Sequence, residues 1–244
     1  MSNLQNKVAE NMLFVAEFAA LVFVIFLIAY VVEKRIYLKN GDRERILSTR
    51  KLAMIGIFSA ISAVLMTIEL PVPFAPPFYK IDLSELPILI ICFAYGPVAG
   101  VMTEFIKILL KLVIKSTSTA FVGELANFSV GCAMVLPAGI IYLEKKTKHM
   151  AMLACFVGVL CMTVFGSAFN AVYLLPKFSE LYGMPLDAIV GMGTAINPRI
   201  VNVQTMAIFA VAPLNLLKGG IDMLLTRLLY KRLSVILKDR PGRR

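Results

Sequence analysis

The sequence predicts an all-α membrane protein, a bundle of six transmembrane helices with one extra transmembrane helix at the N-terminal end. Of its 244 residues, 59% are hydrophobic and only 16% are charged, whereas a soluble domain carries about one quarter charged residues. Apolar runs long enough to cross a bilayer recur along the whole chain. These observations exclude a soluble enzyme, a disordered chain and a collagen-like chain.

The boundaries of the predicted helices follow from the apolar runs and from the prolines and glycines that interrupt them. The expected spans are 11–33, 52–70, 84–95, 98–114, 124–143, 150–175 and 205–229. The spans 84–95 and 98–114 are short for a full crossing, so we expect tilt or burial by neighbouring helices. Pro176 is expected to end the sixth span, and 177–204 to form a long, partly re-entrant outer connection.

A proline-rich segment follows the second span. Pro71, Pro73, Pro76 and Pro77 lie within seven residues, and proline lacks the amide donor that a helix needs. We therefore expect a loop with aromatic and basic side chains. Those side chains are Phe74, Phe78, Tyr79 and Lys80.

The positive charges predict the orientation of the chain. Segments 34–51, 144–149 and 227–244 carry 7, 3 and 7 of its 25 lysines and arginines. Such asymmetry is typical of cytoplasmic loops. It places the C-terminus in the cytoplasm, and it explains the net charge of +10 without nucleic-acid binding. We divide the chain into 1–50, an extra helix with a basic connector, 51–237, the six-helix domain, and 238–244, a basic cytoplasmic tail.

Motifs for catalysis and for metal binding are absent from the sequence. The four cysteines lie in apolar stretches without CxxC or Cys/His spacing, so neither a disulfide framework nor a zinc site is expected. There is no Walker loop, HExxH motif or Ser/His/Asp set. We expect no enzyme activity and no use of ATP by this chain alone.

Ionisable residues inside the apolar runs are costly in hydrocarbon and therefore mark structural or functional sites. Glu104, Lys107 and Lys111 share one helix face. Lys218 and Asp222 form an i,i+4 pair. Two interpretations remain open: the pairs neutralise one another and hold the bundle together, or they take part in transport. Lys111, nearer the outer end of its helix, could instead extend to the interface.

Polar side chains gather toward the predicted outer leaflet. Glu124 and Asn127 lie in the first turn of one span, Asn170 and Tyr173 lie near the outer end of the next, and Asn215 lies in the last. An amide offers both donors and an acceptor, so it can bind the edge of a ring that bears carbonyls and imide nitrogens. Together with the aromatic loop, the set favours a site for a planar ligand with polar edges over amide bonds between helices.

Small residues form a stripe on the second span. Gly56 and Ala60, and Ser59 and Ala63, are each separated by four positions, a spacing that lets another helix approach closely. Packing inside the bundle and docking of a partner subunit are both compatible with this pattern.

Several segments resemble one transporter family. FYKIDLSELPILIICFAYGPVAG, GVMTEFIKILLKL, GELANF, VLPAGIIY, FNAVYLLP and APLNLLKGG are similar, in this order, to segments of the substrate-binding S-component of energy-coupling factor (ECF) vitamin transporters. Among these the chain looks most like the riboflavin-specific subunit. The resemblance covers about residues 51–237.

The resemblance implies a six-helix bundle in the cell membrane of a prokaryote, with an outward pocket capped by the loop 71–81. It implies that Asn127 and Asn170 bind the flavin ring, with Glu124, Tyr173, Lys80 and Asn215 as further contacts. Riboflavin is then a transported ligand, and no cofactor is expected. The implied partners are a transmembrane coupling subunit and two cytoplasmic ATPases.

Two features depart from the family, and three other functions remain open. The span 11–33 lies outside the six-helix core, and the family's Ala-x-x-x-Ala docking motif is replaced by Gly56/Ala60 or Ser59/Ala63. The alternatives are an S-component for thiamine, pantothenate or a pyridoxine-like vitamin, a stand-alone secondary transporter, and a membrane scaffold protein.

Overall fold

The computed structural model describes residues 2–41, 45–117, 119 and 121–238. The helices are α1 (Ser2–Lys39), α2 (Thr49–Thr67), α3 (Glu85–Tyr95), α4 (Pro97–Ile114), α5 (Val122–Glu144), α6 (Lys148–Phe169), α7 (Leu175–Tyr182), α8 (Leu186–Thr194), α9 (Val203–Met206) and α10 (Ala212–Lys238). Two π-helical segments, η1 (Asn170–Leu174) and η2 (Ala207–Val211), lie between α6 and α7 and between α9 and α10. The strands β1 (Leu70–Pro71) and β2 (Lys80–Ile81) pair antiparallel.

The helices are long and apolar enough for a multi-pass membrane protein. Within the described part of the chain, five stretches qualify as spans by length and hydropathy: Phe14–Lys39, Thr49–Thr67, Val122–Glu144, Lys148–Tyr182 and Val203–Leu229. Helix α3 has only 11 residues. Helix α4 has 18 residues, among them three charged ones. The predicted all-α fold is confirmed, and the two short helices are accommodated by burial inside the bundle.

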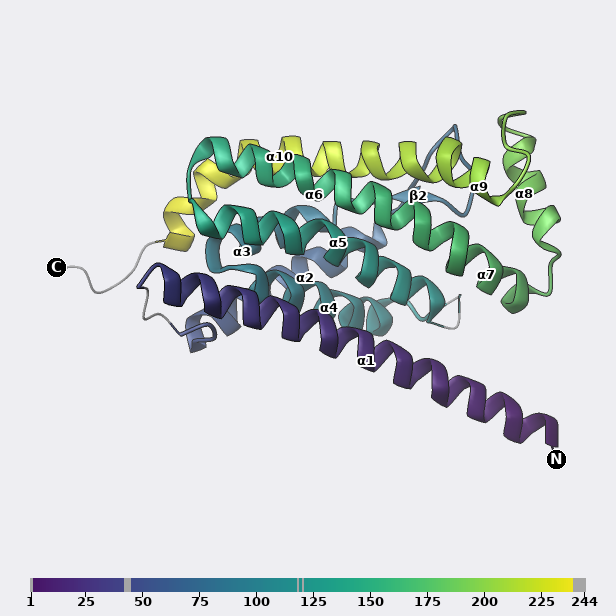
Figure 1. Cartoon of the computed structure of the whole chain (residues 1–244), viewed down its shortest axis with the longest axis horizontal. Coiled ribbons are helices and arrows are strands. Elements are labelled where there is room, and N and C mark those ends of the chain that lie inside the picture. Colours follow the sequence, from purple (N-terminus) through teal and green to yellow (C-terminus); the bar gives the residue numbers. More distant parts are fainter. Residues whose placement is uncertain (1, 42–44, 118, 120, 239–244) are drawn as a thin grey trace.

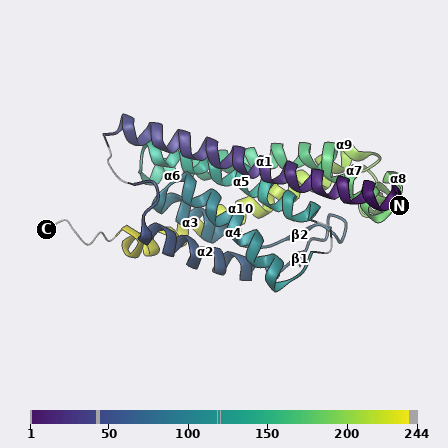
Figure 2. The same cartoon turned by 90° about the horizontal axis from the view of Figure 1, so that it is seen from below.

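The core helices α2 to α6 and α10 lie side by side, and α1 crosses one flank of the bundle obliquely (Figure 1). The hairpin, α7 and α8 lie at one end, with the start of α1, and α10 ends at the other (Figures 1 and 2). Helix α3 is the centre of the packing, since every residue from Leu86 to Phe93 is buried. Its side chains Ile88 and Phe93 pack with Met134 of α5 and Met162 of α6.

Two of the basic segments meet at the end opposite the hairpin. There Lys39 of α1 lies 3.8 Å from Glu144 at the end of α5. The start of α2 lies close by, since Lys51 donates to the Arg45 carbonyl and to the Tyr37 hydroxyl. Of the predicted tail, 239–244 lies outside the described residues.

The helix that begins at Lys148 continues past Pro176, so the predicted stop at this residue is wrong. Pro176 lies in the first turn of α7, directly after η1. The wider turn of a π-helix and the first turn of a new helix both tolerate a missing amide donor. The outer connection that follows is also more regular than predicted, because 186–194 forms α8 and 203–229 forms one long span.

Helix α1 is longer than predicted and is attached to the core through a buried carboxylate. Glu33 is fully buried. Its Oε2 accepts the Val98 backbone N–H at 2.8 Å, at the start of α4. Gly96, which separates α3 from α4, has φ 105° and leaves no room for a Cβ beside the Glu33 carboxylate. The Gly96-Pro97 break therefore turns the chain between α3 and α4. It also leaves space for the Glu33 carboxylate beside the N-terminus of α4, where the helix dipole is positive.

Replacing Glu33 by Ala should destabilise the protein by about 2 kcal/mol, since it leaves the Val98 N–H unsatisfied in a buried place. Glu33→Gln keeps an oxygen that can accept the Val98 N–H, so this variant should lose less stability than Glu33→Ala. Thermal unfolding in detergent measures both, with Glu17→Ala on the exposed face of the same helix as the control. Equal melting temperatures for Glu33→Ala and Glu17→Ala would contradict the capping role.

Candidate functional site

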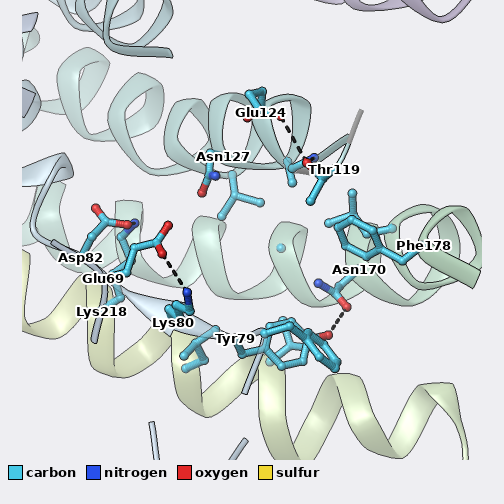
Figure 3. A pocket seen from close by; sticks show the side chains of 18 of the residues that line it. Glu69, Tyr79, Lys80, Asp82, Thr119, Glu124, Asn127, Asn170, Phe178 and Lys218 are labelled. Atoms are coloured by element: carbon cyan, nitrogen blue, oxygen red, sulfur yellow. Dashed lines mark hydrogen bonds and ion pairs between the residues drawn. The ribbon is translucent and has the colours of Figure 1, made fainter. Parts of the chain in front are cut away.

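A cavity of about 590 Å³ opens between the hairpin and the helices at the end of the bundle where α7 and α8 lie. Its volume is in the range of small-molecule sites. The lining comes from α2, the hairpin, α3, α4, α5, α6, η1, α7, α8, η2 and α10. Figure 3 labels ten of these side chains, with Asn127 and Asn170 both in the wall of the cavity.

Three asparagines from three separate elements line the cavity: Asn127 of α5, Asn170 of η1 and Asn215 of α10. Among the described residues, the amides of Asn127 and Asn215 have no hydrogen-bond partner, although Asn215 is only 6% exposed. Gly166 lets the Asn215 amide lie close against α6, since a Cβ there would be 2.6 Å from its Nδ2. Both amides line the cavity, Asn127 from a half-buried position and Asn215 from a buried one, so these two groups are available to a ligand.

The loop between β1 and β2 covers the cavity and is tied to Asn170. The Tyr79 hydroxyl donates to Asn170 Oδ1 at 2.5 Å, as Figure 3 shows. The loop is packed on the other side as well, because Val72, Ala75 and Tyr79 belong to one apolar cluster with α8 and α10. The predicted proline-rich loop is thus present as a lid.

The remaining wall is apolar and adaptable. Four methionines, Met66, Met162, Met184 and Met192, line the cavity with Phe78, Phe178 and Tyr182. Methionine packs well against the faces and edges of aromatic rings. The cavity therefore combines amides for polar ring edges with a wall suited to a flat aromatic body.

A cluster of buried ion pairs adjoins the cavity and reaches its wall through Asp82, Glu85 and Lys218. Lys107 lies 3.0 Å from Glu85 and 2.5 Å from Glu104, and all three side chains are almost fully buried. Lys218 lies 3.0 Å from Asp82 and 3.7 Å from Glu85. The predicted pairing of Glu104 with Lys107 is confirmed.

The predicted pairing of Lys218 with Asp222 is wrong, because two carboxylates from the lid and α3 meet the lysine instead. Neither oxygen of Asp222 has a hydrogen-bond partner among the described residues. Lys111 does not extend to the interface, since it lies 2.7 Å from Glu124. The other Glu124 oxygen accepts from Thr117 and Thr119.

A second set of charges lies at the exposed mouth. Lys80 of β2 and Lys115 after α4 both donate to Glu69 Oε2, at 2.8 and 3.2 Å. Partial burial would raise the pKa of the Glu69 carboxyl, but the two lysines outweigh it and hold this pKa below its ordinary value. Glu69 is therefore ionised at neutral pH.

The structure brings together six of the seven predicted ligand contacts: Asn127, Asn170, Glu124, Lys80, Phe78 and Asn215 all line the cavity. Tyr173 does not, and its ring stacks on Phe169 at 5.2 Å instead. The reason is η1: its wide turn moves the residue three positions after Asn170 away from the cavity and brings Leu174, four positions after it, to the wall.

The small-residue stripe of α2 divides between two faces. Gly56 and Ala60 are exposed. Ser59 and Ala63 are fully buried, and the Ser59 hydroxyl donates to the Thr103 carbonyl of α4. Ser59 and Ala63 therefore pack inside the bundle and are unavailable to a partner, contrary to that part of the prediction.

Several lining residues were not predicted, among them Glu69, Asp82 and Glu85, whereas Tyr79 was expected only as a member of the aromatic loop. The carboxylates gave no sequence signal, since their partners lie far along the chain. In the described part of the chain, no three His, Cys, Asp or Glu side chains are grouped as metal ligands.

Tyr79→Phe should loosen the lid, because it removes the hydrogen bond to Asn170. A bond worth about 1 kcal/mol corresponds to roughly fivefold faster amide exchange in the loop. Hydrogen–deuterium exchange of the peptide that spans 72–79 measures this. Tyr182→Phe, whose hydroxyl has no partner among the described residues, is the matched control; equal exchange in both variants would refute the latch.

Comparisons with known proteins agree with this architecture. The family model of the ECF transporter, substrate-specific component, matches residues 50–230. Riboflavin transporter RibU of Staphylococcus aureus (strain TCH60) is 32% identical over 82% of this chain and 98% of its own length. Riboflavin transporter FmnP of Bacillus subtilis (strain 168) is 27% identical over 77% of this chain and 94% of its own.

A solved structure of the S component of a bacterial ECF transporter matches with a TM-score of 0.60 and 32% identity, over 78% of this chain and 98% of that one. The whole of α1 lies outside the 181 residues matched by the family model. The chain is thus a component of a membrane transporter and not an enzyme, and it belongs to the family of substrate-specific components of ECF transporters.

Proposed function

We propose that this chain binds riboflavin on the outer side of the cell membrane and delivers it to an energising module. The observation that carries the proposal is a pair of amides, Asn127 and Asn215, that have no hydrogen-bond partner in the part of the chain that the structure describes and that line a lidded cavity of about 590 Å³. The names of the relatives, which are riboflavin transporters, support the choice of vitamin.

The chemistry of the cavity suits this ligand. The isoalloxazine ring is flat and carries carbonyls and an imide N–H along one edge, and an amide can both donate to and accept from such an edge. The Asn170 Nδ2 group is available as a further donor, since its Oδ1 is bonded to Tyr79. The methionines and aromatic rings of the wall would pack against the ring faces.

We propose further that a transmembrane coupling subunit and two cytoplasmic ATPases supply the energy. The exposed Gly56/Ala60 face of α2 is the docking surface in this proposal, because small residues let a partner helix approach. The end of the molecule that carries the basic segments 34–51 and 144–149 would then face the cytoplasm, together with the C-terminus. Riboflavin is cargo here, and no cofactor is part of the proposal.

The purified chain should bind one riboflavin and quench its fluorescence at micromolar or lower concentration, in a titration with thiamine, pantothenate and pyridoxine as competitors. Asn127→Ala and Asn215→Ala should each weaken binding roughly tenfold, the cost of one lost buried hydrogen bond. Asn197→Ala, in an exposed turn outside the cavity, is the control.

Melting temperatures of the three variants establish that each is folded. Preferential stabilisation by another vitamin would reassign the ligand. Riboflavin affinity unchanged in both cavity variants would reject the site.

Gly56→Leu should prevent co-purification with the coupling subunit and leave riboflavin affinity unchanged, because the change adds a bulky side chain only to the outer face of α2. Gly220→Leu is the matched control, since a Cβ at either glycine has no neighbour within 4 Å. Assembly that tolerates Gly56→Leu as well as it tolerates Gly220→Leu would place the docking surface elsewhere.

A further inference from the structure

The charged side chains of the cavity are balanced in number. Its lining contains four carboxylates and four lysines, and no arginine or histidine among the described residues. The carboxylates are Glu69, Asp82, Glu85 and Glu124, and the lysines are Lys80, Lys111, Lys115 and Lys218. A ligand therefore meets a wall without net charge.

Every one of these lysines is already paired with a carboxylate. Lys111 is engaged by Glu124 at 2.7 Å. Lys218 is engaged by Asp82 at 3.0 Å. Lys80 and Lys115 share one oxygen of Glu69. An anionic group on a ligand would have to share these ammonium groups with a carboxylate that repels it.

The helix ends at the cavity are also closed to anions. A helix N-terminus attracts a phosphate through its free N–H groups and its dipole. The two helices that begin at the cavity wall, α3 and α5, each carry a glutamate in the first turn, Glu85 and Glu124. These carboxylates occupy the positions at which a phosphate would gain most, and they repel it.

The pairing at the mouth is the one most open to change. The side chains of Lys80 and Lys115 are 41% and 53% exposed, against 11–12% for Lys218 and Lys111. Two lysines there depend on a single carboxylate. Removal of that charge would leave two cations at the mouth with nothing to neutralise them.

We infer that Glu69, by holding Lys80 and Lys115, makes the cavity selective for an uncharged flavin over its phosphate ester. The inference rests on the proposed riboflavin function and extends it to the charge of the ligand. Glu69 acts through the two lysines, and hence it is a positioning residue that determines specificity.

The test is a titration of the full chain with riboflavin and with flavin mononucleotide, at low and high salt. The unaltered chain should bind the phosphate ester at least roughly tenfold more weakly than riboflavin. Glu69→Gln should narrow this ratio by roughly tenfold, mainly through tighter binding of the ester, and the gain should shrink as salt rises. Glu69→Asp keeps the negative charge and should therefore keep the ratio of the affinities for riboflavin and flavin mononucleotide.

Glu180→Gln is the matched control, because Glu180 is paired with Lys177 at 2.8 Å but lies outside the cavity. The double variant Glu69→Gln with Lys115→Gln should lose part of the gain in affinity for flavin mononucleotide that Glu69→Gln shows. The riboflavin affinity reports whether each variant is folded. Equal affinities of the unaltered chain for the two flavins, or a ratio that Glu69→Gln leaves unchanged, would overturn the inference. Failure of the unaltered chain to bind riboflavin at all would overturn the proposed function, and the inference with it.

Discussion

Paired charge inside an apolar bundle is the constraint on which this structure depends. A single ion in hydrocarbon costs several kcal/mol, and a buried lysine persists only where carboxylates meet it with good geometry. Lys107 and Lys218 satisfy this requirement together, because both approach Glu85. The resulting cluster joins α3, α4, α10 and the residue that follows the hairpin, Asp82. Through Asp82, this cluster holds the end of the hairpin against α10 at the cavity wall.

Among the described residues, the lysines of this cluster are paired with carboxylates and not with the amides of the cavity. The asparagines are thus left for the cavity, with only Asn170 engaged by the lid. The two π-helical segments, which contact each other, lie where the long spans border the cavity. Such segments interrupt the regular helix repeat and change which side chains face inward. A rigid frame with a few available polar groups is the arrangement that a specific small-molecule site requires.

The sequence predicted the parts of this structure that depend on local chemistry. Apolar runs gave the spans, prolines gave the lid, and amides near one membrane face gave most of the cavity contacts. Some failures arose from tertiary contacts, and others arose from the π-helical turn of η1. An i,i+4 rule paired Lys218 with Asp222, but Asp82, 136 positions away, is the actual partner. Tyr173 was expected from its place near the outer end of its span and from the family resemblance, and the π-helical turn of η1 places it outside the cavity lining.

Ser59 and Ala63 show the same limit. Small residues at a spacing of four allow close packing, but the pattern does not say whether the neighbour is a helix of the same chain or of another protein. Here α4 is the neighbour. The attachment of α1 through Glu33 and Val98 had no sequence signal either, since it joins residues 65 positions apart.

The central claim, that amides without protein partners receive the ligand, is tested most directly by solution NMR of the detergent-solubilised chain labelled with ¹⁵N-asparagine. The side-chain amide signals of Asn127 and Asn215, assigned by substitution, should shift on addition of one equivalent of riboflavin, while that of Asn197 stays in place. Saturation of the protein with riboflavin and no movement of the Asn127 and Asn215 signals would contradict the account.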